Sequence, residues 1–115
     1  IRRRGENISS FEIEAIVNTY PGIVESGAVA VPAEHGEDEV KIAVVLAPQS
    51  SFEPADLITF LDSKMPRFAI PRFIEVWESL PKTEATARIQ KAKIRDSGIS
   101  TDTWDRVAAG IKLRG

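Results

Sequence analysis

The sequence predicts an α+β fold, a two-layer sandwich in which helices pack on a small, mainly antiparallel, three-stranded sheet. Segments with strand-type patterns and segments with helical periodicity follow one another as helix, strand, strand, helix, strand. This order lacks the strict alternation of strands and crossover helices that a parallel, doubly wound sheet requires. The length of 115 residues fits one compact domain.

The first predicted helix begins at Ser9, a residue type that caps helix N-termini. Glu12, three residues later, completes a capping box. The apolar residues that follow fall at helical spacing and form one stripe of Ile13, Ile16, Val17 and Tyr20. Pro21 and Gly22 mark its end, because proline disfavours helical geometry in the residue before it and glycine permits the turn.

Two strands are predicted next, in residues 23–31 and 40–46. The first is rich in β-branched and small residues, and the second alternates, with one face formed by Val40, Ile42, Val44 and Leu46. The acidic loop between them, AEHGEDE, suits an antiparallel pair. We interpret His35, the only histidine, as part of a solvated turn, because no second imidazole exists to complete a typical metal site. The sequence therefore predicts no metal site.

The second predicted helix starts at Pro54, since proline is favoured in the first helical turn, and ends at Pro66. Its buried stripe consists of Leu57, Ile58, Leu61 and Met65. A third strand is predicted over residues 72–77. Beyond it the chain becomes polar and basic, with a short helix expected over residues 89–95, a stop at Gly98, and a last short helix from Asp102 to about residue 109.

Composition excludes several classes of protein. The 15 basic and 17 acidic residues give a net charge of -2, whereas a dedicated nucleic-acid-binding domain usually carries a strong basic excess. The sequence has no cysteine, which excludes disulfides and thiolate metal sites and is compatible with a reducing compartment. No apolar run approaches the roughly 20 residues that cross a bilayer. We therefore expect a cytoplasmic domain without a nucleic-acid partner and without a membrane span.

Two basic segments at opposite ends of the chain, RRRGEN and PKTEATARIQK, have no obvious structural role. One interpretation is a standalone module that binds protein or nucleic acid through the arginines. A more specific interpretation comes from four sequence blocks in order: IRRRGENISSFEIE, AVAVPAEHGEDEVKIAVVL, MPRFAIPRFIEVWESLPKT and IQKAKIR. Together they resemble the C-terminal domain of the adenylate-forming enzymes, which include acyl-CoA synthetases, the adenylation domains of peptide synthetases and firefly luciferase. The resemblance covers about residues 1–95 and is greatest to small-acid or carnitine-type CoA ligases.

The resemblance implies a mobile lid. In such enzymes an N-terminal domain, absent from this sequence, holds ATP with Mg²⁺ and a small carboxylic acid. The acid is first activated as acyl-AMP, and after a rotation of the lid the acyl group passes to coenzyme A. Residues 1–8 then form the loop after the hinge, residues 9–95 the α+β core, and residues 96–115 a tail with a short helix. The isolated fragment is expected to be inactive. An adenylation domain that serves a carrier protein is an alternative within the family.

The resemblance also implies catalytic residues in the second basic segment. Aligning IQK with the family motif places Ala87 where the family has glycine and Arg88 where it has the catalytic lysine, in a loop that is one residue longer. Arginine keeps the positive charge that stabilises a developing phosphate charge, but it is broader and planar. Lys91 and Lys82 are the other candidates, after Arg88. The alternative is that all three are solvated surface charges.

The first basic segment is expected to face coenzyme A. Gly5 allows the backbone to approach the thiol arm closely, because glycine has no Cβ. Arg3 and Arg4 are candidates for the phosphates of coenzyme A, since guanidinium groups bind phosphate oxygens bidentately. Glu6 belongs to the same loop, where we expect it to fix the loop to the start of the first helix.

Overall fold

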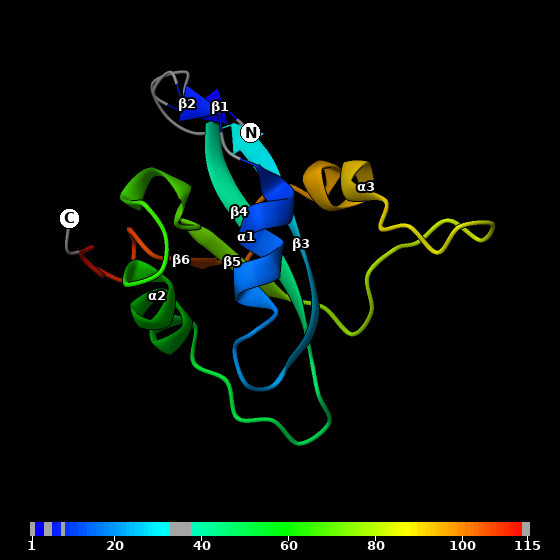
Figure 1. Cartoon of the computed structure of the whole chain (residues 1–115), viewed down its shortest axis with the longest axis horizontal. Helices are drawn as coiled ribbons and strands as arrows, with labels where there is room; N and C mark the ends of the chain where they lie inside the picture. Colours follow the sequence, from blue (N-terminus) through cyan, green and yellow to red (C-terminus); the bar gives the residue numbers. More distant parts are fainter. Residues whose placement is uncertain (1, 4–5, 8, 33–37, 114–115) are drawn as a thin grey trace.

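The computed structural model describes residues 2–3, 6–7, 9–32 and 38–113, which form a mixed four-stranded sheet with helices packed on it (Figure 1). The sheet has the order β3-β4-β5-β6, and a separate two-stranded sheet pairs β1 with β2. The strands are β1 (Arg2–Arg3), β2 (Glu6–Asn7), β3 (Ile23–Pro32), β4 (Asp38–Leu46), β5 (Phe73–Val76) and β6 (Trp104–Asp105). The helices are α1 (Ser10–Val17), α2 (Pro54–Asp62), α3 (Lys91–Asp96) and the 3₁₀ turn η2 (Arg67–Ala69).

The sheet confirms the α+β class and corrects the predicted number of strands. β3 and β4 pair antiparallel from Ile23↔Leu46 to Pro32↔Asp38, as expected. β5 pairs parallel with β4, because the segment that carries α2 and η2 crosses back before β5 begins. β6 adds an antiparallel edge next to β5, so the sheet has four strands of mixed direction where three were predicted.

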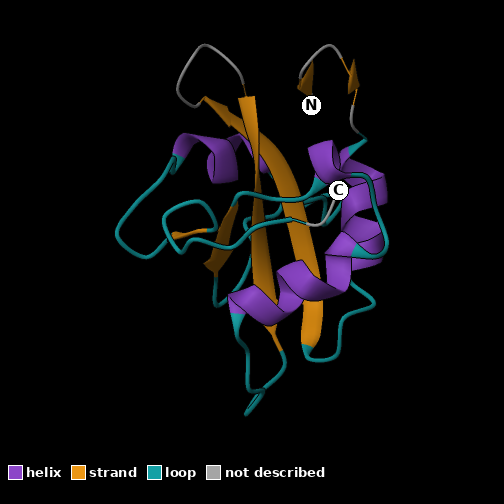
Figure 2. Cartoon of the chain, turned by 90° about the vertical axis from the view of Figure 1, so that its left-hand side faces the viewer, coloured by secondary structure: helices purple, strands orange, loops and turns teal. Residues whose placement is uncertain are grey.

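Helices lie on both sides of the sheet (Figure 2). On one face, α1 and α2 bury the apolar stripes that their periodicity predicts, against β4 residues Val40, Ile42 and Val44. On the other face, Ile94 of α3 packs with Ala43 and with residues of β3. This third layer was not part of the predicted two-layer sandwich. It is possible because the second face of β4 is also buried.

The first two helices begin as predicted. The hydroxyl of Ser9 accepts a hydrogen bond from the amide of Glu12 at 3.3 Å, and Pro54 occupies the first turn of α2. The backbone at Gly22 has a φ of +94°, which explains why glycine stands at the turn into β3. α2 ends at Asp62, about one turn before the predicted Pro66, so Met65 lies beyond the helix although it still packs against the core.

The short helix predicted from Asp102 does not form. Trp104 pairs with Ile74 of β5, and the carboxylate of Asp105 binds Arg72 and the amide of Val107. These bonds hold residues 104–105 as strand β6 and bend the following residues into turns, because the local apolar pattern is too short to outweigh them. By contrast, the predicted stop of α3 is correct, since Gly98 follows the helix with a φ of +62°.

His35 and most of its acidic loop fall in residues 33–37, outside the described part of the chain. Among the residues that the structure describes, no group of three or more histidine, aspartate or glutamate side chains is placed to hold a metal ion. In the same residues, no helix is both long enough and apolar enough to cross a membrane.

Candidate functional site

Residues 81–91 form a projecting hairpin, called here the basic hairpin, which is the yellow loop that extends from the body of the molecule in Figure 1. It leaves the sheet after the buried Leu80 and returns at the start of α3. Its two arms are joined by a bridge between Lys82 and Ile89 and by a hydrogen bond from the Gln90 amide to the Pro81 carbonyl at 2.7 Å. The hairpin therefore has a defined backbone although most of its residues are exposed.

The tight end of the basic hairpin depends on a left-handed residue. Ala87 has a φ of +54°, and its amide donates to the Thr83 carbonyl at 2.9 Å. Residues with a Cβ rarely adopt this conformation, whereas glycine adopts it without strain. Ala87 is also the position that the sequence alignment matched to a glycine. The backbone geometry therefore fits this alignment, which in turn matches Arg88 to the catalytic lysine.

Arg88 follows Ala87 and is exposed. Its guanidinium makes no ion pair with any residue in the described ranges, while its amide and carbonyl both bind Thr83. A solvated cation alone interacts weakly with a phosphate, because water screens the charge. It becomes effective when a second surface excludes the water. Arg88 is therefore a cation on a fixed backbone, and it can act strongly on a phosphate only when another protein surface covers it.

Lys82, on the opposite arm, is paired with a carboxylate. Its Nζ lies 2.9 Å from Oε2 of Glu25 on β3, and the two side chains are 40% and 28% exposed. An ion pair with this degree of exposure contributes about 0–1 kcal/mol, so its partners exchange readily with water or with a ligand. Lys82 is thus a second cation of the basic hairpin, and Glu25 already neutralises part of its charge.

Lys91, the first residue of α3, is held more firmly. Its Nζ pairs with the Glu14 carboxylate, donates to the Ser10 hydroxyl at 2.9 Å and lies 4.8 Å from the centre of the Phe11 ring. Glu14 is buried, and the same carboxylate oxygen accepts the Ala28 amide at 2.7 Å. Lys91 therefore joins the base of the basic hairpin to α1 and β3. The three cations predicted from the sequence lie on one hairpin, but only Arg88 is unpaired among described partners.

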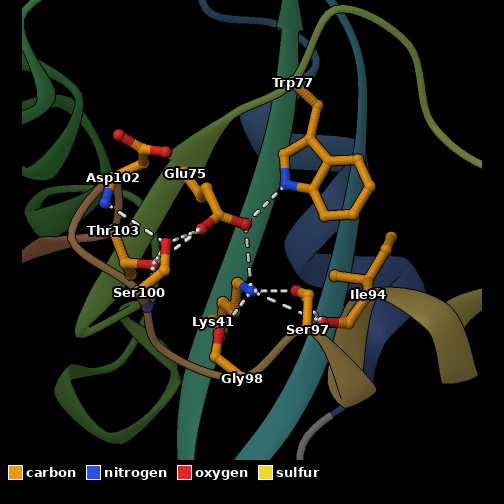
Figure 3. Close-up of polar contacts among 9 residues, drawn as sticks. All are labelled: Lys41, Glu75, Trp77, Ile94, Ser97, Gly98, Ser100, Asp102 and Thr103. Carbon is orange, nitrogen blue, oxygen red and sulfur yellow. Dashed lines mark hydrogen bonds and ion pairs between the residues drawn. The ribbon is translucent and has the colours of Figure 1, made fainter.

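A buried polar cluster, which sequence reasoning missed, fixes the far end of α3 (Figure 3). Lys41 is completely buried, and its Nζ contacts Oε1 of Glu75 at 3.1 Å, the Ser97 hydroxyl at 2.8 Å and the Gly98 carbonyl at 2.7 Å. Trp77 donates to Glu75 through Nε1 at 2.7 Å. The only signal in the sequence was a lysine on the strand face that also holds Ala43 and Val45.

The Glu75 carboxylate remains ionised in this cluster. Burial raises its pKa, but hydrogen bonds from Thr103, Lys41 and Trp77, together with the charge of Lys41, outweigh that effect and lower the pKa below its ordinary value. The cluster links β4 and β5 to the residues after α3. Lys91 holds the other end of that helix, so the basic hairpin joins a helix that is anchored at both ends.

The predicted coenzyme-facing loop is described only in part. β1 and β2 pair antiparallel through Arg2↔Asn7 and Arg3↔Glu6, and they lead directly toward α1. The predicted residues Arg4 and Gly5 lie outside the described residues. The roles assigned to Arg3, Arg4, Gly5 and Glu6 therefore stay predictions.

Comparisons with known proteins agree with the family resemblance of the sequence. The family model described as "AMP-binding enzyme C-terminal domain" matches residues 12–86, a range that ends just before Arg88. The peroxisomal trans-cinnamate:CoA ligase of Petunia hybrida is 30% identical over 101 residues, which cover 88% of this chain and 18% of the relative. The fatty acid–[acyl-carrier-protein] ligase ScoC of Streptomyces coeruleorubidus is 34% identical over 92 residues, covering 80% of this chain and 18% of the relative.

Among solved structures, ATP-bound MatB from Rhodopseudomonas palustris superposes with a TM-score of 0.79 at 26% identity, over 84% of this chain and 19% of that chain. The chain therefore spans about a fifth of the length of the relatives that it matches.

Proposed function

This chain belongs to the family of AMP-binding enzyme C-terminal domains, and we propose that it is the mobile C-terminal domain of an ATP-dependent acid–CoA ligase. The match covers most of the α+β core, and curated relatives include enzymes named as CoA ligases. The substrate is a small carboxylic acid, and its binding pocket belongs to the N-terminal domain. That domain also binds ATP and Mg²⁺. The cytoplasmic location that we propose is compatible with the lack of cysteine.

The proposed reaction has two steps. The carboxylate oxygen attacks the α-phosphorus of ATP, the bond to the bridging oxygen breaks, and pyrophosphate leaves, so that acyl-AMP remains. The thiol of coenzyme A then attacks the acyl carbon, AMP leaves with the electrons of the broken C–O bond, and the thiol proton passes to solvent. Mg²⁺, when bound with ATP by the N-terminal domain, would supply positive charge beside the phosphates. This chain contributes a cation to the first step and the segment of residues 2–7 to the second.

The proposal rests on the environment of the Arg88 side chain. Its guanidinium is exposed and unpaired among described residues, and it stands on a hairpin whose backbone is fixed. Guanidinium groups bind phosphate oxygens bidentately, so Arg88 fits the α-phosphate of ATP during acyl-AMP formation. Lys91 is occupied by Glu14 and Ser10, and we assign it to the structure of the hairpin base. Lys82 can add positive charge next to the phosphates when its exposed pair with Glu25 opens.

The second step involves the segment that contains Gly5. We propose that Gly5 adjoins the thiol arm, that Arg3 and Arg4 bind the phosphates of coenzyme A, and that Glu6 fixes this segment to the start of α1. Free coenzyme A is the acceptor that we propose first, because two relatives are named as CoA ligases, whereas the name of ScoC favours an acyl-carrier protein as the second candidate.

The test separates the two half-reactions in the full-length enzyme. Arg88→Ala should slow acid-dependent ATP–pyrophosphate exchange about 100-fold or more, since one preorganised group that stabilises transition-state charge contributes this much. Thioester formation from supplied acyl-AMP and coenzyme A should stay within about threefold, because the substitution at the α-phosphorus, the step that Arg88 is proposed to assist, is then already complete. Arg95→Ala, at an exposed arginine of α3, is the matched control and should leave both rates unchanged.

Equal losses in both half-reactions, or no loss in the first, would contradict the role of Arg88. The 115-residue chain alone should form no acyl-AMP, because ATP and the acid bind elsewhere. Detectable acyl-AMP formation by the isolated chain would contradict the assignment of both substrates to another domain.

A further inference from the structure

Thr83 binds Arg88 through two of its polar groups and binds Ala87 through a third. Its amide donates to the Arg88 carbonyl at 2.9 Å, and its hydroxyl accepts the Arg88 amide at 3.3 Å. Its carbonyl accepts the amide of Ala87, the residue before Arg88, at 2.9 Å. Its hydroxyl also lies 2.6 Å from that of Thr86. Both backbone groups of Arg88 are therefore bound by one residue on the opposite arm of the basic hairpin.

We propose that Thr83 is a positioning residue for Arg88, an assignment that rests on the proposed function and deepens it. The hydroxyl of Thr83 has two lone pairs and one proton, so it can accept the Arg88 amide while it shares a hydrogen bond with Thr86. Its amide and carbonyl close the hairpin around the left-handed Ala87. Thr83 thereby sets the direction in which the Arg88 side chain leaves the backbone.

This geometry matters because Arg88 has no other anchor among the described residues. A long side chain on a loose backbone reaches the phosphate only in a fraction of its conformations. A misplacement of about 1 Å in a catalytic group lowers a rate by about 100-fold. ATP is bound by the N-terminal domain in the proposed function, so loosening the hairpin should lower kcat of acyl-AMP formation and leave the KM for ATP unchanged.

The experiment compares three variants of the full-length enzyme. Thr83→Val preserves the branched shape of the side chain but removes the hydroxyl, whereas Thr83→Ser keeps the hydroxyl. Thr59→Val is the matched control, because Thr59 is exposed on α2 and its hydroxyl also makes one hydrogen bond to the backbone, donating to the Ala55 carbonyl at 3.2 Å. ATP–pyrophosphate exchange, thioester formation from supplied acyl-AMP, and the melting temperature are measured for each.

We expect Thr83→Val to lower kcat of the exchange reaction about tenfold or more, with the KM for ATP within about twofold. Thioester formation should match that of the parent enzyme. Thr83→Ser should restore kcat to within about threefold of the parent, and Thr59→Val should change neither half-reaction. The melting temperature of Thr83→Val should match that of Thr59→Val, because the hairpin projects from the core.

A parent-like kcat in Thr83→Val, or an equal loss in both half-reactions, would overturn the inference. Combining Thr83→Val with Arg88→Ala gives a further test, since a residue that acts through Arg88 adds no loss once Arg88 is removed. An additional loss in the double variant would also overturn it. If Arg88→Ala itself retains exchange activity, the proposed function of Arg88 fails. If only Thr83→Val retains it, the proposed function stands and the role of Thr83 fails.

Discussion

Lys41 of β4 and Glu75 of β5 form an ion pair inside the protein, with 3.1 Å between Nζ and Oε1 and no exposure of the lysine side chain. Both groups are also hydrogen-bonded, Lys41 to Ser97 and Gly98, and Glu75 to Trp77 and Thr103. Charges in a protein interior are tolerated only with such complete pairing. The pair is therefore a structural element that holds the end of α3 on the sheet.

Replacing Lys41 should strongly destabilise the chain. Lys41→Met keeps an unbranched apolar stem but leaves the Glu75 carboxylate buried without its counter-charge. Loss of one partner from a buried pair lowers the free energy of unfolding by about 3–5 kcal/mol. Urea unfolding of the 115-residue chain measures this, with Lys93→Met on the exposed face of α3 as a control that should change the value by less than about 0.5 kcal/mol. Similar midpoints for the two variants would contradict the structural role.

The ion pair between Asp105 and Arg72 should make stability depend on pH. Burial raises the pKa of Asp105, but hydrogen bonds from Arg72 and from the Val107 amide, with the charge of Arg72, outweigh it and hold the pKa below the ordinary value of 3.8. The carboxylate therefore stabilises the fold above pH 3.8, and this contribution is lost as the pH falls through the lowered pKa. The Glu75 carboxylate likewise stabilises the fold above pH 4.5, its ordinary pKa, and this contribution is lost as the pH falls through its lowered pKa.

Asp105→Asn isolates this effect. The variant should be less stable than the parent at neutral pH by about 1 kcal/mol, and the difference should shrink once the pH falls below 3.8 and through the lowered pKa. Urea unfolding at several pH values measures the difference, and Asp102→Asn, at an exposed carboxylate nearby, is the control. A difference that stays constant over this range would show that the titration of Asp105 does not contribute.

Local sequence patterns were sufficient for α1 and α2, whose apolar stripes match one buried face each, and for β3, β4 and β5, whose residue types or alternation are typical of strands. The alternation in β4 even separated Lys41 from the face of Val40 and Ile42. Its burial was not predictable, since its partner Glu75 reaches it only through the parallel register of β4 and β5. β6 was missed for the same reason, because two residues that pair with a strand about thirty positions earlier leave no local signal.

For the candidate site, the sequence predicted three cations in one segment, which the structure shows as one hairpin, but it could not rank those cations by environment. Arg88 came first by alignment alone. The carboxylates that occupy Lys82 and Lys91 lie on β3 and α1, far away in the sequence, and become their partners only in the folded chain. The geometry of Ala87 is a different case. The alignment placed Ala87 where the family has glycine but predicted no backbone conformation, and the structure shows a φ of +54°, which glycine adopts without strain.

Ala87→Gly should tighten the basic hairpin. The left-handed conformation costs alanine about 1–2 kcal/mol, whereas glycine loses about 0.4–1 kcal/mol through the greater freedom of its unfolded chain. The net effect is a small stabilisation of the hairpin, and the amides of Ala87 and Thr83 should exchange with solvent more slowly. Hydrogen exchange measured by NMR tests this, with the Thr103 amide, which binds Ser100 in another loop, as the internal reference. Ala87→Val should accelerate exchange at the same amides, and unchanged rates in both variants would count against strain at this position.

Lys91 links α3 to α1 through its ion pair with Glu14 and its hydrogen bond to Ser10, so its replacement should lower the stability of the chain. Lys91→Met removes the counter-charge of the buried Glu14 carboxylate but leaves its hydrogen bond from Ala28, so the free energy of unfolding should fall by about 1–3 kcal/mol. Lys82→Met, in the same hairpin but in an exposed ion pair, should lower it by less than about 1 kcal/mol.

A double-mutant cycle with Glu14→Gln separates the ion pair from the other contacts of Lys91. We expect a coupling energy between the two positions of about 1 kcal/mol or more, because the charges meet where Glu14 is largely shielded from water. Urea unfolding of the parent, both single variants and the double variant gives this value. Additive effects would mean that Lys91 contributes through Ser10 and Phe11 instead. A Lys91→Met variant as stable as the parent would remove the reason for assigning Lys91 to structure, and Lys91 would return beside Arg88 as a candidate for the phosphate-binding cation.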